Sequence, residues 1–185
     1  MPLTVKQRAE TIATFRFIEI HLMETLARWT PSTPEMEAKI LFGRHVWETA
    51  QHADILGKRT YELRAAMHFT QKPNDAYLDI LARLASVDGG ANRLHAFYDV
   101  MLPALAKRYE NYIAMTDTLL DAPSVKVIRR ILGDMNVMRE EADALRRDVP
   151  RLAAHSNDSS LAASESAIDA FVVHHVRPVM QEATA

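Results

Sequence analysis

The stretch FRFIEIHLMETLARWTPSTPEMEAKILFGRHVWETAQHADIL, residues 15–56, decides the fold. In its first half, apolar residues recur at the three- and four-residue intervals of a helix face: Phe15, Ile18, Leu22, Leu26 and Trp29. Pro31 ends this helix, because the residue before a proline avoids the helical region. Thr33 as N-cap and Pro34 as first helical residue then begin the next helix. Two long helices joined by such a tight turn are predicted to pack as antiparallel neighbours.

The same start and stop signals divide the rest of the chain into helices. The predicted helices span residues 4–29, 33–66, 75–87, 91–120, 123–149 and 164–176. Pro103 is expected to kink the helix over 91–120. The sequence thus predicts an all-α protein: an antiparallel four-helix bundle over 1–150, with one long crossover that carries a short helix. Residues 151–185 are predicted to form a linker and a C-terminal helix, with the polar stretch 156–160 as the linker.

Composition excludes several classes of protein. The 185 residues include no cysteine, which rules out disulfides and thiolate metal sites, and only 5 glycines, which disfavours a turn-rich β fold. Lys and Arg (22) nearly balance Asp and Glu (24), a net charge of −2 that gives no support for nucleic-acid binding. No apolar run has the length of a membrane span, and no signal-peptide pattern is present. The sequence therefore predicts a cytoplasmic protein with neither a nucleic-acid nor a membrane partner.

Polar residues interrupt the predicted core faces. Glu19 lies within the apolar stripe of the first helix, where a carboxylate is costly unless it is paired, hydrogen-bonded or bound to a metal. His45, Glu48 and His52 share one face of the second helix. Asp134 and Glu141 flank the apolar stripe of the helix over 123–149. Imidazole and carboxylate together suit iron, manganese, zinc or nickel.

Counting from the turns predicts that some of these residues lie level with one another. Glu19 precedes Pro31 by about as many residues as Glu48 follows Pro34, so an antiparallel pair brings the two carboxylates to the same height. The same counting back from Val149 on the helix over 123–149 reaches Met135, next to Asp134. We therefore expect Glu19, Glu48, His52 and Asp134 to form one polar layer that holds a metal ion, with His45 and Glu141 as further ligands or supporting residues.

The sequence resembles the ferritin-like superfamily in Phe-Ile-Glu19-Ile-His-Leu and in Trp-Glu48-Thr-Ala-Gln-His52-Ala-Asp. The resemblance implies a bundle with one long crossover and a site for two iron or manganese ions that react with dioxygen. It therefore implies a non-haem metal oxidoreductase acting on a small organic substrate. The chain departs from the family pattern because Gln51, not a histidine, follows Glu48 by three residues.

This departure leaves three hypotheses open. One is a metal oxidoreductase with two ions or a single ion. Another is a metal-free bundle that serves as a binding or assembly module. The third is a metal-independent enzyme in which His45, Glu48 or His52 acts as general acid or base. A homodimer is also expected, through a second face of the helix over 33–66 that carries Phe42, Trp47 and Tyr61.

Overall fold

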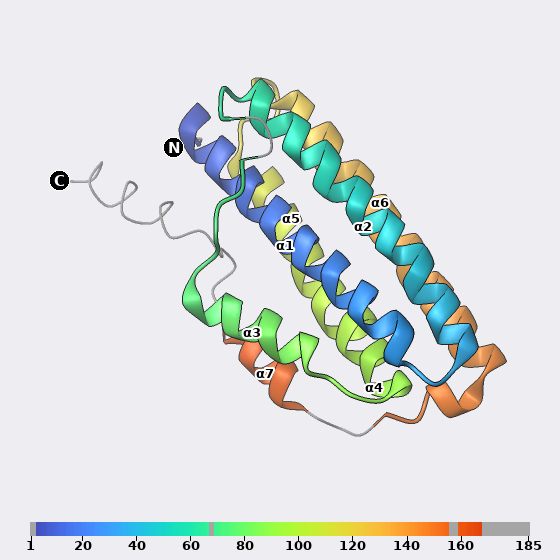
Figure 1. Ribbon diagram of the computed structural model, residues 1–185. Coiled ribbons are helices and arrows are strands. Elements are labelled where there is room, and N and C mark those ends of the chain that lie inside the picture. Colours follow the sequence, from blue (N-terminus) through green and yellow to red (C-terminus); the bar gives the residue numbers. More distant parts are fainter. Residues whose placement is uncertain (1–2, 67–68, 156–158, 168–185) are drawn as a thin grey trace.

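The structure is a computed structural model and describes residues 3–66, 69–155 and 159–167 (Figure 1). The elements follow in the order α1 (Val5–Ser32), α2 (Met36–Glu62), α3 (Asp75–Ala85), α4 (Gly90–Leu94), the π-helix η1 (His95–Met101), α5 (Leu102–Met115), α6 (Ala122–Asp148), the 3₁₀-helix η2 (Pro150–Leu152) and α7 (Ser159–Ser166). These described ranges contain helices and no strand, so the all-α prediction is confirmed.

The antiparallel pair α1 and α2 forms the most extensive contact between two elements of the fold (Figure 1). The predicted boundary between them is wrong by a few residues, because α1 continues through Pro31 to Ser32. The hydroxyl of Thr33 donates to the carbonyl oxygen of Trp29 at 2.8 Å and accepts from Arg93 at 2.8 Å. Thr33 therefore closes α1 instead of capping α2, whose N-cap is Glu35.

The predicted helix over 91–120 is three consecutive elements, α4, η1 and α5. The π-helix η1 ends immediately before Leu102, and Pro103 lies in the first turn of α5. Proline has no N–H to donate, and its ring collides with the carbonyl group four residues earlier, which belongs to Asp99. Widening that turn into a π-helix removes the collision, so the expected kink takes the form of η1.

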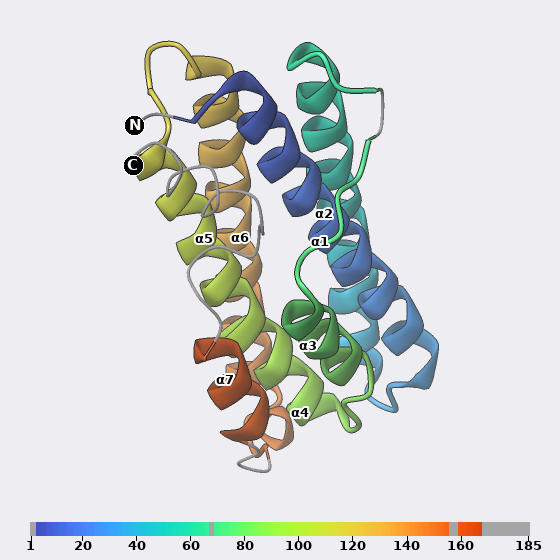
Figure 2. The same cartoon turned by 90° about the vertical axis from the view of Figure 1, so that its left-hand side faces the viewer.

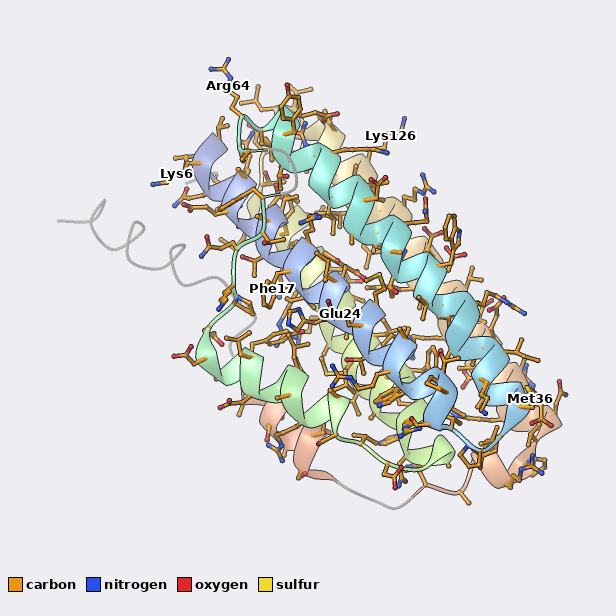
Figure 3. All side chains as sticks on the ribbon, viewed as in Figure 1. Lys6, Phe17, Glu24, Met36, Arg64 and Lys126 are labelled. Carbon is orange, nitrogen blue, oxygen red and sulfur yellow. The ribbon has the colours of Figure 1, made fainter. Side chains whose placement is uncertain are left out.

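The second half of the bundle consists of α5 and α6, with α6 packed along α2 (Figures 1 and 2). Lys6 and Arg64 lie near one end of the bundle, where α1 begins and α2 ends, and Met36 lies at the other (Figure 3). Among the described residues, no helix has the length and hydropathy that crossing a membrane requires.

Two short helices cover one side of the bundle. The crossover carries α3, and α7 packs against both α3 and η1 (Figure 2). The helix α7 begins at Ser159, inside the stretch predicted as a linker, and ends at Ser166. Most of the helix predicted over 164–176 lies outside the described residues.

The core is built from the predicted apolar stripes. Its largest fully buried side chains include Trp29, Phe15, Phe42, Tyr98 and Tyr109. Phe42 is 0% exposed, so its predicted place on a free outer face is wrong. It faces inward because it shares the face of Ala38, Leu41 and His45, which packs against α1 and α6.

Candidate functional site

A buried layer of polar residues crosses the middle of the bundle. His52 of α2 donates from Nδ1 to Glu19 Oε2 of α1 at 3.3 Å, and its Nε2 lies 3.5 Å from Asp134 Oδ2 of α6. The hydroxyl of Tyr109, on α5, donates to Glu19 Oε1 at 2.7 Å. All four main helices thus contribute to this set, which we call the His52 layer (Tyr109, Glu19, His52 and Asp134). Three of the predicted ligands meet in it.

The charges in the His52 layer favour a protonated imidazole. Burial alone lowers the pKa of His52, but the nearby carboxylates of Glu19 and Asp134 outweigh it and raise the pKa above the ordinary 6.5. Glu19 is 0% exposed and His52 is 1% exposed, so this ion pair is isolated from water. The layer thus places a buried imidazole between two carboxylates, an arrangement that favours its protonated form.

Glu48 is the predicted ligand that the structure leaves outside this layer. The core-facing side chains around it are His45, Thr49 and His52, all buried, whereas Glu48 is only partly buried. Each residue of a helix is rotated by about 100° from the one before, which places Glu48 on the flank of this face. It belongs to neither the hydrogen bonds nor the ion pairs of the layer.

A second buried network surrounds His45, one to two turns along α2. Its Nδ1 accepts from the Tyr98 hydroxyl at 2.6 Å, and its Nε2 donates to Glu141 Oε2 at 2.9 Å. Arg44 pairs with the other carboxylate oxygen of Glu141 at 2.8 Å. Burial lowers the pKa of His45 below 6.5, despite the opposing effect of Glu141. We call this set the His45 network (Tyr98, His45, Glu141 and Arg44); its imidazole is neutral at pH 7.

The two sets do not converge on one metal position. Glu19 and Asp134 contact opposite ring nitrogens of His52, and Glu141 belongs to the separate His45 network. Across residues 3–66, 69–155 and 159–167, no three His, Asp or Glu side chains are grouped as a metal ion requires. As arranged, the predicted ligands fit hydrogen-bonded ion pairs and do not fit a di-metal centre. The apolar side chains of Phe15, Leu22, Met101 and Met138 are packed in the core, each 2% exposed or less.

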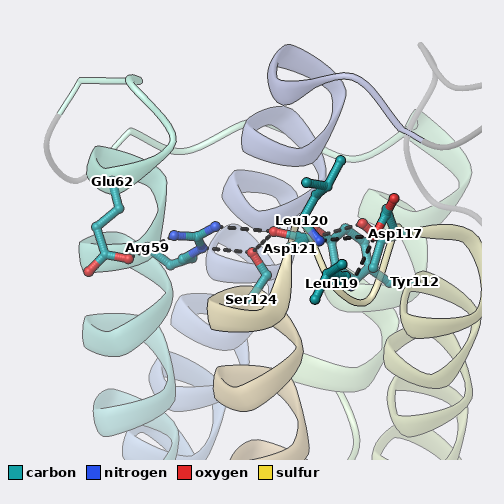
Figure 4. A network of polar contacts seen from close by, with 9 residues as sticks. Arg59, Glu62, Tyr112, Asp117, Leu119, Leu120, Asp121 and Ser124 are labelled. Carbon is teal, nitrogen blue, oxygen red and sulfur yellow. Dashed lines mark hydrogen bonds and ion pairs between the residues drawn. The ribbon is translucent and has the colours of Figure 1, made fainter.

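A third polar cluster joins α2 to the start of α6 (Figure 4). Arg59 donates from Nη2 to Asp121 Oδ1 at 3.1 Å and from Nε to Ser124 Oγ at 2.7 Å. Asp121 also accepts from the hydroxyls of Tyr112 at 2.6 Å and Thr116 at 2.8 Å. Burial opposes its charge, but these hydrogen bonds prevail and lower its pKa. Every oxygen of this buried carboxylate is occupied, so the cluster is structural.

An open cavity of about 350 Å³ lies between α3, η1 and α7. Its walls carry a mixture of charged, polar and small apolar side chains: Arg83, Ser86, Val87, Asp88, Asn92, His95, Ala96, Val100, Ser160 and Leu161. We call it the His95 cavity. Sequence reasoning missed it because its walls come from three segments that are distant in the chain.

His95 combines two properties that the buried histidines lack with a carboxylate hydrogen bond that they share. It is partly exposed, it lines a cavity, and its Nδ1 donates to a carboxylate oxygen of Asp99 at 2.9 Å. Arg146 of α6 contacts both oxygens of Asp99, at 3.1 and 2.9 Å, and so fixes the carboxylate. The ring of His155 stacks on His95 with centroids 3.9 Å apart. The sequence signal was the four-residue spacing of His95 and Asp99, both of which lie in η1.

No protein-family model, no curated protein and no solved structure matches this chain. The functional argument therefore rests on the residues themselves.

Proposed function

We propose that this protein binds a small polar molecule in the His95 cavity and exchanges a proton with it through His95, without a metal. The observation that carries the proposal is the His95–Asp99 hydrogen bond at the wall of the cavity. A cavity with convergent polar groups and a positioned histidine is the default candidate for a binding or catalytic site.

The chemistry follows from the tautomer of His95. Because Nδ1–H donates to Asp99, the neutral ring carries its lone pair on Nε2, which is the nitrogen that accepts a proton. Asp99, held by Arg146, stabilises the imidazolium that results. Arg83 lies on the same wall and brings a positive charge to the cavity, with its guanidinium already donating to Ser160 and Ser164. In this proposal His95 is the general acid–base, and Asp99 is the positioning residue.

We also infer that this chain descends from a ferritin-like bundle. Two antiparallel helix pairs, α1–α2 and α5–α6, are separated by a crossover that carries α3, which agrees with the order of elements in such bundles. The His52 layer then occupies the part of the bundle in which the resemblance implies metal ligands. We infer that hydrogen-bonded ion pairs have replaced the metal ligands there, and that the chemistry has moved to the outer side of η1.

The test is a ligand-observed NMR screen of small polar acids, amides and phosphate against the full chain. We expect at least one compound whose saturation-transfer signal is lost in His95→Gln and reduced in Arg83→Met. His21→Gln is the matched control, since His21 lies on α1 outside the cavity, where it stacks on the Phe17 ring and contacts the Phe17 carbonyl. If every compound found binds His95→Gln and the parent protein equally well, the proposal is wrong.

A metal oxidoreductase is the second candidate, and one observation favours it. His52 Nε2 is buried without a hydrogen-bond partner and faces Asp134. Elemental analysis of protein grown with added iron and manganese tests this candidate. Metal that disappears in His52→Gln and Asp134→Asn would support it, and protein without metal above background would count against it.

The outer face of α2 favours assembly of two copies of the chain. Met36, Ile40 and Trp47 are 63%, 59% and 64% exposed along this face. Gly43 lies between Ile40 and Trp47 with open space beside its Cα. In an antiparallel pair of α2 helices, Trp47 of each copy would fit against Gly43 of the other, which is the self-complementarity that a twofold dimer needs. Sedimentation of Trp47→Ala and Gly43→Leu tests this, since a dimer through this face becomes monomeric in both.

A further inference from the structure

A buried arginine lies where α3, α5 and α7 meet. The side chain of Arg108, on α5, is 5% exposed, and its guanidinium carbon lies 5.1 Å from the centroid of the Tyr77 ring on α3. Glu165 of α7 forms an ion pair with Arg108 Nη1, which also donates to the carbonyl oxygen of Ala104 at 3.0 Å. A buried cation is therefore neutralised by a residue from a short peripheral helix.

This cluster contains more donors than Glu165 satisfies. Within the described part of the chain, Arg108 Nε, the hydroxyl of Tyr77 and Glu165 Oε1 are all buried without a hydrogen-bond partner. Buried polar groups are hydrogen-bonded in the great majority of cases, so unsatisfied groups on both partners of an ion pair are unusual. Glu165 engages one edge of the guanidinium as an ion pair and leaves Nε unused.

The helix that supplies Glu165 is short and lies on α3 and η1. It is 8 residues long, and helices this short are marginal in water without tertiary contacts. Arg83 contacts Ser164 and Ser160 at the surface, at 2.5 and 3.0 Å, and Leu161 is buried. The stability of α7 therefore depends on its tertiary contacts, among which is the ion pair of Glu165 with Arg108.

We infer that Arg108 and Tyr77 form a binding site for a small carboxylic acid, and that Glu165 occupies this site in the structure seen here. The fork of an arginine matches a carboxylate through two parallel N–H groups, so a free acid can use Nε as well as a terminal nitrogen. The hydroxyl of Tyr77 is a further donor for the same ligand. Glu165, tethered by its own backbone, acts as an internal competitor.

This inference uses other side chains than the proposed function, and the two sites share only the helix α7. The His95 cavity is lined by Ser160 and Leu161, near the start of α7, whereas Glu165 lies near its end. Loss of binding in His95→Gln bears only on the cavity, and loss of binding in Arg108 variants bears only on the site inferred here.

The decisive experiment compares propionate binding by the full chain and by Glu165→Ala, using calorimetry. Propionate reproduces the end of a glutamate side chain. A tethered carboxylate competes at an effective concentration in the millimolar range, so we expect Glu165→Ala to bind propionate at least ~10-fold more tightly than the parent protein. Propionamide, which lacks the charge, should not bind. Glu110→Ala removes an exposed glutamate from α5 and should leave propionate binding at the parent level.

A second pair of variants shows whether Arg108 is the residue that binds propionate. In the Glu165→Ala background, Arg108→Lys keeps the charge but removes the fork, and should weaken propionate binding at least ~10-fold. Tyr77→Phe removes one donor without changing the packing, and should weaken it several-fold even if Arg108→Lys fails to fold. The inference is overturned if Glu165→Ala binds propionate no better than the parent protein, or if binding survives both substitutions.

Discussion

The His52 layer and the His45 network use the same components but shift the pKa values of their histidines in opposite directions. Each has a histidine on α2, a carboxylate on α6 and a buried tyrosine hydroxyl. Both imidazoles are 1% exposed, so burial does not distinguish them. His52 contacts two carboxylates, one of them fully buried. His45 contacts one carboxylate, which Arg44 shares, and a neutral hydroxyl. The carboxylates around each ring therefore decide the direction in which its pKa is shifted.

The largest expected loss of stability comes from removing Glu19, the buried carboxylate of the His52 layer. Glu19→Ala leaves an imidazolium and the Tyr109 hydroxyl buried without their partner, which costs about 3–5 kcal/mol of unfolding free energy. Glu141→Ala removes the corresponding carboxylate of the His45 network, whose side chain is 33% exposed, and should cost only about 1 kcal/mol. Urea denaturation of both variants measures the difference. Equal losses would mean that the two networks contribute alike, against the comparison drawn above.

Removing one hydroxyl from each region sharpens the same contrast. The Tyr109 hydroxyl donates to a buried carboxylate, and such hydrogen bonds contribute about 1.5–3 kcal/mol. The Tyr98 hydroxyl donates to a neutral ring, for which about 0.5–1.5 kcal/mol is typical. We therefore expect Tyr109→Phe to lower the unfolding free energy more than Tyr98→Phe. Tyr61→Phe on the exposed face of α2 is the control and should change little.

The contrast between the two regions was only partly predictable from the sequence. Glu19, His52 and Asp134 meet as expected because the turn between α1 and α2 lies within a few residues of its predicted place, and counting from it sets heights along the bundle. The prediction for Glu48 failed because counting residues gives the height of a side chain along the helix but not its direction around the axis, which changes by about 100° per residue. Tyr98 was not expected to bond His45, because it lies in the π-helix η1, where the sequence predicts only a kink at Pro103. The His95 cavity depends on α7, whose position the local sequence does not specify.

The pH dependence of stability should have opposite signs in the two regions. The raised pKa of His52 means that its stabilising contribution is complete below the ordinary value of 6.5 and is lost as pH rises through the folded-state pKa. The lowered pKa of His45 means that its contribution is present above 6.5 and is lost as pH falls through the folded-state pKa. The stability difference between the parent protein and His52→Gln should thus shrink above pH 6.5, and that for His45→Gln should shrink below it.

Histidine-selective NMR titration of the parent protein checks the same assignment directly. The ring signals of His52 should titrate with a midpoint above 6.5 and those of His45 with a midpoint below it. A common titration midpoint for the two rings would contradict the account.

The smallest expected loss of stability comes from removing Arg44, which pairs with Glu141 on α6. Arg44 is 54% exposed and pairs with Glu141 at 2.8 Å, so Arg44→Ala should cost at most about 1 kcal/mol. Its effect on charge should still be measurable, because Arg44 helps to lower the pKa of His45 and its removal should raise that pKa. Arg130 is the matched control: it lies 3.8 Å from Asp134 with its side chain 64% exposed, and Glu19 holds the charge of His52 in either case. Arg130→Ala should therefore leave His52 protonated at pH 7. If Arg44→Ala leaves the titration of His45 unchanged, sharing of Glu141 is not what separates the two histidines, and the neutral Tyr98 hydroxyl must account for the difference.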